Sequence, residues 1–148
     1  MIRRPPRSTL SSSSAASDVY KRQILVTSAG ITALYGMAPT QEAVKVMRDK
    51  AGIDISSHLT RGLTSETAES ADLILVMEKI HKDFISEKVP SAKDKTYLLK
   101  EFGADREDIK EAGIPDPIGR PLEVYEEVYY QIEDAVKDAA KRIKEINL

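Results

Sequence analysis

Three polar residues stand where this sequence could do acid–base or phosphate chemistry. Asp116 forms an Asp-Pro pair just before the last predicted helix, where a carboxyl group could protonate a leaving group. Ser28 follows a short apolar run, and His58 lies in a polar connection between two predicted helices. Each also has a plainer interpretation, because Asp-Pro is common in turns, a serine can satisfy a turn and a histidine can cap a helix. Position must therefore decide between the interpretations.

The sequence excludes several other kinds of site. It contains no cysteine, so disulfides, thiolate metal sites and cysteine nucleophiles are ruled out for the chain as written. Its two histidines, His58 and His81, are too few for a histidine metal cluster. His81 stands among charged residues of a predicted helix, and we expect it to be solvated. We therefore expect no metal and no cofactor.

A parallel sheet would bring such residues to one edge. The apolar run Asp72–Met77 shows no alternation, which is typical of a strand buried on both faces. Ile24–Ser28 precedes it and Thr96–Leu99 offers a third short strand, with helical patterns between them. This order predicts an α/β fold, a three-layer parallel sheet flanked by helices. Ligands in such folds bind at the carboxyl ends of the strands.

Capping residues mark the predicted helices. Thr40 is a candidate N-cap and Gly52 a candidate C′ residue. Pro121 suits the first position of a long helix that reaches about Ile146. Gly103–Pro115 lacks a sustained period and predicts a surface loop, with at most a helical turn near Glu107–Ala112. The other expected helices are Gln41–Ala51, Ser65–Ser70 (capped by Thr64) and Lys79–Lys88, and the apolar face of the last helix comprises Leu122, Tyr125, Val128, Ile132, Val136, Ala139, Ile143 and Ile146.

The first 23 residues differ in composition from the rest. Met1–Gln23 carries five basic residues against one acid, a serine run and almost nothing apolar, which predicts a disordered tail. Met1–Thr9 and Ser13–Gln23 can also be encoded by strings that resemble the adapter and transposase end of short-read sequencing libraries. We therefore expect residues 1–23 to be non-native and the domain to comprise residues 24–148.

Length and hydropathy indicate one domain. The chain has 148 residues and a net charge of -2, and no apolar run approaches the roughly 18 residues that a membrane span needs. No apolar core of a signal peptide is present. We expect a cytoplasmic protein that binds neither membrane nor nucleic acid. A basic arm for nucleic acid is a weaker alternative, because no aromatic residues interleave its arginines.

Four segments, taken in order, resemble the low-molecular-weight protein tyrosine phosphatases, a family that includes related arsenate reductases. The match spans Ile24 to about Asn147. The segments look like the family's second-strand signature, the segment after its second helix, its third strand and its acid loop, and are respectively Thr27–Gly30, Gly52–His58, Ala71–Met77 and Pro115–Pro117.

The resemblance implies a four-stranded parallel sheet whose first strand leads into a Cys-x5-Arg-Ser phosphate loop at a helix N-terminus. In the family the cysteine thiolate attacks phosphorus, and the aspartate of the Asp-Pro loop protonates the leaving oxygen. Asp116 matches that acid, while Ser28 and His58 match residues that hydrogen-bond an asparagine of the phosphate loop. The first strand and the phosphate loop have no counterpart here, so we expect a truncated and catalytically dead chain.

The leading hypothesis is thus a fragment of a phosphatase whose intact parent acts on a phosphorylated protein or a small phosphomonoester. The alternatives are a pseudophosphatase that acts as a binding module, or a parent arsenate reductase. Ile118–Gly119 follows the Asp-Pro pair where some members carry two tyrosines, which leaves the phosphorylated side chain open. Strand edges exposed beside the missing strand predict aggregation or non-native oligomers.

Overall fold

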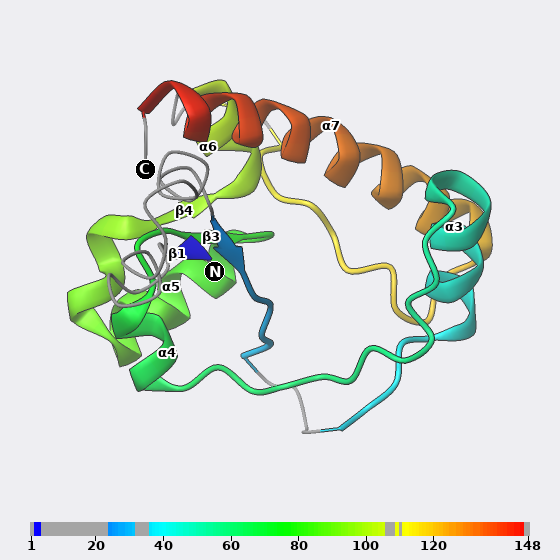
Figure 1. The fold of residues 1–148 in the computed structure, drawn as a ribbon, viewed down its shortest axis with the longest axis horizontal. Coiled ribbons are helices and arrows are strands. Elements are labelled where there is room, and N and C mark those ends of the chain that lie inside the picture. Colours follow the sequence, from blue (N-terminus) through cyan, green and yellow to red (C-terminus); the bar gives the residue numbers. More distant parts are fainter. Residues whose placement is uncertain (1, 4–23, 32–35, 106–108, 110, 147–148) are drawn as a thin grey trace, which may run out of the picture.

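The computed structural model describes residues 2–3, 24–31, 36–105, 109 and 111–146. Helices surround a small central sheet, and the long α7 runs along one side of the molecule (Figure 1). The elements are, in order, β1 (Ile2–Arg3), β2 (Leu25–Val26), α3 (Gln41–Ala51), α4 (Ser65–Ser70), β3 (Ile74–Val76), α5 (Lys79–Lys88), the 3-10 helix η1 (Pro90–Lys95), β4 (Thr96–Leu98), α6 (Leu99–Ala104) and α7 (Leu122–Ile146).

Strands β3 and β4 lie in the core of the fold. They pair in parallel, with Ile74 opposite Thr96 and Val76 opposite Leu98. Successive side chains of a strand point to opposite faces, and each face of β3 enters a different apolar cluster. Leu75 packs against the cluster that contains residues of α6 and α7, whereas Ile74 belongs to the cluster that contains residues of α5. The prediction of a strand buried on both faces is therefore confirmed, although the strand is shorter than Asp72–Met77.

Strand β2 lies outside that ladder. Ile24–Ser28 was the predicted strand, but only Leu25–Val26 is extended and paired, antiparallel to β1. Its side chains are exposed, Val26 by 73%. A ladder of two residues buries little surface by itself, which is consistent with this exposure. β1 falls within Met1–Gln23, where we predicted a disordered tail and no strand. Residues 1 and 4–23 lie outside the described residues, so the rest of that prediction is not tested.

The predicted helix boundaries hold wherever a cap defines them. The Thr40 side chain accepts a hydrogen bond from the Ala43 N–H, and Gly52 takes the left-handed conformation at φ 67° that ends α3. Thr64 and Thr67 cap α4 reciprocally. α5 and α7 also match their predicted ranges within one residue. These features are local, so short sequence patterns suffice to predict them.

Helix α6 was not predicted. The prediction placed Leu99 in a strand and Gly103 in a loop, and both are wrong, because β4 ends at Leu98 and α6 spans Leu99–Ala104. Only Leu99 and Phe102 of this short helix are buried, too few to show a helical period. The predicted helical turn near Glu107–Ala112 lies largely outside the described residues.

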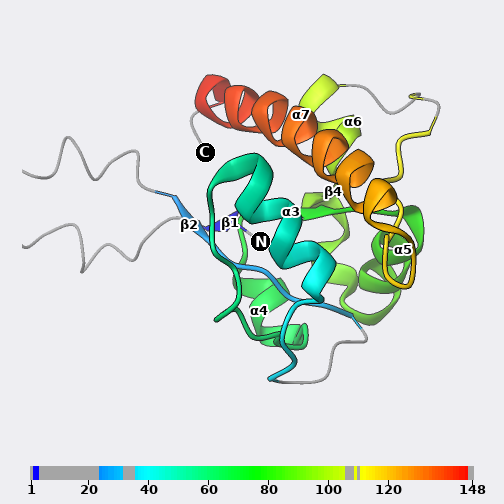
Figure 2. The ribbon, with the colours of Figure 1, turned by 90° about the vertical axis from the view of Figure 1, so that its right-hand side faces the viewer.

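Helix α7 packs on α6 through its C-terminal half and on α3 through its N-terminal half, as Figures 1 and 2 show from two sides. Gly103 makes the α6 contact possible, since a Cβ there would lie 2.9 Å from the Asp138 Cβ. The predicted apolar face is buried at Tyr125, Val128, Ala139 and Ile143. Val136 and Ile146 are instead about half exposed. Val136 borders two cavities, so little packs against it.

Candidate active site

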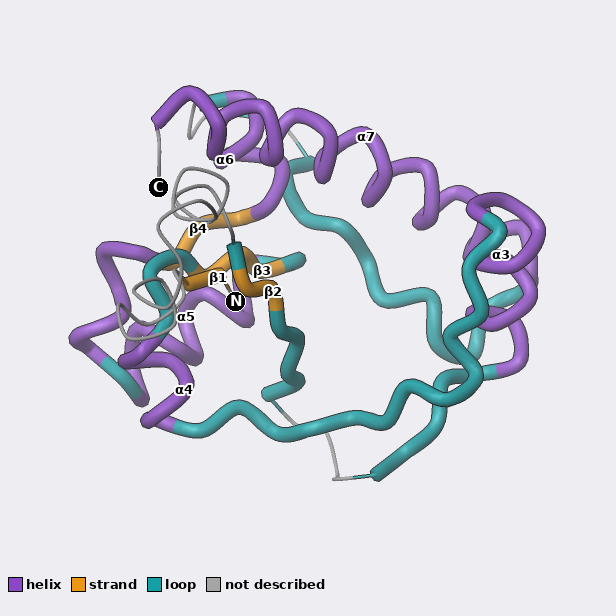
Figure 3. The backbone as a smooth tube through the Cα atoms, in the orientation of Figure 1, coloured by secondary structure: helices purple, strands orange, loops and turns teal. Residues whose placement is uncertain are grey.

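The loop that carries Asp116 is fastened to the end of β3. The backbone N–H of Ile114 donates to the Met77 carbonyl oxygen at 2.8 Å. The Ile114 side chain is 1% exposed and lies in the core cluster between α6 and α7. The connection then runs as a loop beside α7 towards α3 (Figure 3). Buried apolar packing and one backbone hydrogen bond therefore hold the loop at the carboxyl end of a parallel strand, where ligands bind in this class of fold.

Asp116 itself is exposed at the tip of this loop. Its Oδ1 accepts a hydrogen bond from the Ile118 N–H at 3.0 Å, which closes an Asx turn. The Arg120 N–H donates to the Pro117 carbonyl oxygen at 2.9 Å, and Gly119 takes φ 76°, a conformation that favours glycine. The second carboxylate oxygen has no hydrogen bond within the described residues. A carboxyl group held by one oxygen can exchange a proton through the other.

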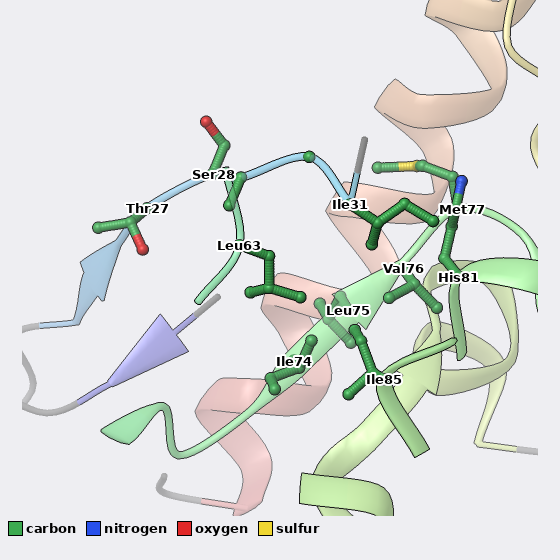
Figure 4. A pocket seen from close by; sticks show the side chains of 12 residues that line it. Thr27, Ser28, Ile31, Leu63, Ile74, Leu75, Val76, Met77, His81 and Ile85 are labelled. Carbon is green, nitrogen blue, oxygen red and sulfur yellow. The ribbon is translucent and has the colours of Figure 1, made fainter. Parts of the chain in front are cut away.

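Ser28 shares a cavity with the residue that follows β3. It lines a cavity of about 300 Å³ together with Met77 and His81. Figure 4 shows the apolar side chains of Leu63 and Leu75 in this cavity, while the Ser28 hydroxyl points away from them. Ser28 and the Asp116 loop are therefore both related to Met77, Ser28 through the cavity that it lines with Met77 and the loop through the hydrogen bond of Ile114.

His58 makes no described contact with Ser28 or Asp116. It is exposed in a turn in which its backbone N–H donates to the Ile55 carbonyl oxygen at 2.9 Å. The following residues return to the first loop, since Gly30 and Gly62 form a parallel bridge. Among the described residues, no hydrogen bond joins His58 to Ser28 or Asp116. Just after the turn, Thr60 exchanges backbone hydrogen bonds with Gly36 and Met37, so the described contacts do not place the His58 side chain beside Ser28.

His81 does not match its predicted environment. The sequence predicted a solvated side chain, but His81 is half-buried, and its Nδ1 accepts a hydrogen bond from the Glu78 N–H at 3.3 Å. Glu78 is the N-cap of α5, so the imidazole satisfies a backbone donor at the helix start. That partner fixes one ring nitrogen as an acceptor and leaves His81 a structural role in the cavity wall.

Thr40 and Tyr125 form a contact that the sequence analysis missed. The Thr40 hydroxyl donates to the Tyr125 hydroxyl at 3.1 Å, which joins the start of α3 to α7. Pro117 of the acid loop and Tyr125 line the same cavity, of about 440 Å³, between α3 and α7. The residues are 85 positions apart, and no local pattern relates them. The cap of α3 is thereby linked to the helix that follows the acid loop.

The described residues hold no group of three or more histidine, aspartate or glutamate side chains that could bind a metal ion. None of the described helices is both long enough and apolar enough to cross a membrane.

Comparison with known proteins agrees with this geometry. The family model described as "Low molecular weight phosphotyrosine protein phosphatase" matches residues 6–147. A protein-arginine-phosphatase of Geobacillus stearothermophilus is 36% identical over 121 residues, which are 80% of this chain and 76% of that protein. A low molecular weight protein-tyrosine-phosphatase of Acinetobacter johnsonii is 32% identical, covering 82% and 80% of the two chains. The solved arginine phosphatase YwlE from G. stearothermophilus superposes with a TM-score of 0.72 at 34% identity, covering 80% of this chain and 73% of that one.

Proposed function

Because the chain belongs to the low molecular weight phosphotyrosine protein phosphatase family, we propose that its scaffold serves phosphomonoester hydrolysis, with Asp116 as the general acid. The observation that carries the proposal is the anchoring of the Asp116 loop on Met77 through Ile114. This anchoring supports the proposal because it restrains the loop that carries the carboxyl group. The relatives' names include phosphatases for tyrosine and for arginine, so the substrate is a phosphorylated protein side chain met in the cytoplasm.

Ser28 and His58 would act on the phosphate-binding loop rather than on the substrate. Ser28 supports this because it borders the cavity beside Met77. His58 supports it only through the chain that links its turn to Gly30. We expect each to orient a loop residue by hydrogen bonding. Their loss should therefore weaken catalysis without removing a reacting group.

The family's reaction also requires a cysteine nucleophile, and this sequence contains no cysteine. One solved relative, 30% identical, is described as a cysteine-to-serine mutant of YwlE with a phosphorylated active-site serine. In that protein the residue at the cysteine position receives the phosphoryl group. We therefore expect the present chain to release no phosphate above a no-enzyme blank, since losing a nucleophile removes most of a rate enhancement.

The test is to replace residues 1–23 with a family-type strand, a Cys-x5-Arg-Ser loop and a helix. A folded chimera should hydrolyse aryl phosphates and phosphoproteins, and its cysteine-to-serine version should not. Ser28→Ala and His58→Ala should cost less activity than Asp116→Asn. A folded chimera that is inactive, or indifferent to Asp116→Asn, contradicts the proposal. A chimera that reduces arsenate but spares phosphoesters assigns the scaffold to the other branch of the family.

A further inference from the structure

Lys100 of α6 joins three parts of the chain that are far apart in the sequence. Its ammonium group donates to the Gln131 side-chain oxygen at 2.9 Å and to the Glu111 carbonyl oxygen at 3.2 Å. Gln131 lies on α7, and Glu111 lies in the segment that leads to the Asp116 loop. Hydrogen bonds in which one partner is charged are stronger than neutral ones. The half-buried lysine therefore connects both helices to the start of that segment.

The backbone at Glu111 has a conformation that residues with a side chain rarely adopt. Its φ is 55°, in the left-handed region that favours glycine. Such a conformation costs free energy and persists where the surrounding contacts impose it. The hydrogen bond from Lys100 to the Glu111 carbonyl oxygen is a contact of this kind. It holds the backbone at a turn just before the chain enters the core.

The residues after Glu111 enter two different apolar clusters. Ala112 is 8% exposed and belongs to the cluster that contains residues of α5. Ile114 is 1% exposed and belongs to the cluster that contains residues of α6 and α7, and its N–H donates to the Met77 carbonyl oxygen. A change in the backbone dihedrals of Glu111 would redirect both residues. The turn at Glu111 thus determines how Ile114 reaches Met77.

We propose that Lys100 is a positioning residue for the Asp116 loop. By bonding to the Glu111 carbonyl oxygen and the Gln131 side chain together, it fixes the turn from which the loop starts. It acts through the backbone and not on the substrate. The inference rests on the proposed function only in taking Asp116 as the acid that the loop presents.

A different role for Lys100 would be to join α6 to α7, but that contact has other supports. Arg142 of α7 donates to the Phe102 carbonyl oxygen at 2.9 Å and pairs with Asp105 at 2.9 Å. The two helices also pack closely at Gly103, where a Cβ would lie 2.9 Å from the Asp138 Cβ. Loss of Lys100 should therefore loosen the segment at Glu111 more than it loosens the two helices.

Amide hydrogen exchange in the full chain measures the two effects separately. The Ile114 N–H reports the start of the Asp116 loop, and the Val89 N–H, which donates to the Ile85 carbonyl oxygen at 2.8 Å, reports the core beside α5. Lys100→Met removes the charge and the donors but keeps the apolar stem. It should speed exchange at Ile114 by about tenfold or more, with little change at Val89. Equal acceleration at the two amides, or none at Ile114, would overturn the proposal.

Further variants test whether the effect comes from this contact. Lys100→Arg keeps a cationic donor and should restore most of the protection at Ile114. Gln131→Leu should accelerate exchange less than Lys100→Met, because Lys100 can still donate to Glu111. Combining the two changes should add nothing to Lys100→Met alone, and additive effects would overturn the proposal. Lys88→Met changes an exposed lysine in the last turn of α5 and should leave Ile114 as protected as in the parent.

The chimera with a cysteine loop separates this inference from the proposed function. There Lys100→Met should lower kcat more than it changes KM, and it should cost nothing further once Asp116→Asn is present. Faster exchange at Ile114 in a chimera that is indifferent to Asp116→Asn supports the positioning role and contradicts the proposed function. A chimera that requires Asp116 but keeps its activity and its Ile114 protection in Lys100→Met supports the function and overturns the positioning role.

Discussion

Ile114 donates its backbone N–H to the carbonyl oxygen of Met77 at 2.8 Å, and this bond ties the Asp116 loop to the residue that follows β3. The Ile114 side chain is buried among residues of α6 and α7, so the same residue fixes the loop twice. A long loop with few contacts has high conformational entropy, and the two contacts of Ile114 restrict the conformations open to Asp116.

Ile114→Ala should therefore destabilise the chain by about 3 kcal/mol, the usual cost of a buried isoleucine-to-alanine cavity. Urea unfolding measures this free energy. Ile118→Ala, at a position 65% exposed in the same loop, is the matched control and should cost less than about 0.5 kcal/mol. Equal costs at the two positions would mean that Ile114 does not anchor the loop.

Thr40→Ala should lower the free energy of unfolding by about 1 kcal/mol, because α3 loses its N-cap. Thr40→Ser keeps a hydroxyl and should recover most of that loss. Since the Thr40 hydroxyl also donates to Tyr125, a double-mutant cycle with Tyr125→Phe should show a coupling above about 0.5 kcal/mol. Strict additivity would show that the contact between α3 and α7 contributes nothing.

The exposed residues of β2 should make the chain self-associate. Val26 presents 73% of its surface to solvent on a short strand, and such edges recruit other chains. Val26→Lys should shift the protein towards the monomer in size-exclusion chromatography with light scattering. Ile80→Lys, a change at a helical position that is 66% exposed, should not. A parent chain that is monomeric and melts once at high temperature would contradict this prediction.

Glu133 predicts a small acid-dependent contribution to stability. The hydrogen bond from Lys137, and then that from Tyr129, lowers the pKa of Glu133 below its ordinary value of 4.5. A carboxylate whose folded-state pKa is lowered stabilises the fold above its unfolded pKa and loses that contribution as the pH falls through the folded value. Melting temperatures of the parent and Glu133→Gln should thus differ near pH 7 and converge below about pH 4. A constant difference in melting temperature at all pH values would show that the ionisation of Glu133 does not contribute to stability.

The parts of the fold that the sequence predicted correctly depend on local patterns. Thr40, Gly52 and Thr64 set helix ends through their own side chains or backbone, and the unbroken run at Ile74–Val76 marks a buried strand. The acid role of Asp116, which the resemblance implies, remains a prediction.

What the sequence could not predict depends on distant partners. The antiparallel pairing of β2 with β1 joins residues more than 20 positions apart, and two-residue strands carry no readable period. Half-burial of His81 depends on the loop containing Ser28, which closes the cavity from elsewhere in the chain. Val136 belongs to the apolar face of α7, but it is exposed because it borders two cavities instead of packed side chains.

The general acid role proposed for Asp116 makes the sharpest prediction, to be measured in the chimera that carries a cysteine loop. Protonation of the leaving oxygen matters more as that oxygen becomes more basic. Asp116→Asn should therefore slow aryl phosphates with acidic phenols only slightly and those with basic phenols by about a hundredfold or more. A plot of log kcat/KM against phenol pKa should steepen in the variant. Glu123→Gln, an exposed carboxylate in the first turn of α7, is the matched control and should leave the slope unchanged. An equal loss of kcat/KM for all phenols would mean that Asp116 positions the loop. Only a loss of proton transfer should depend on the basicity of the leaving group.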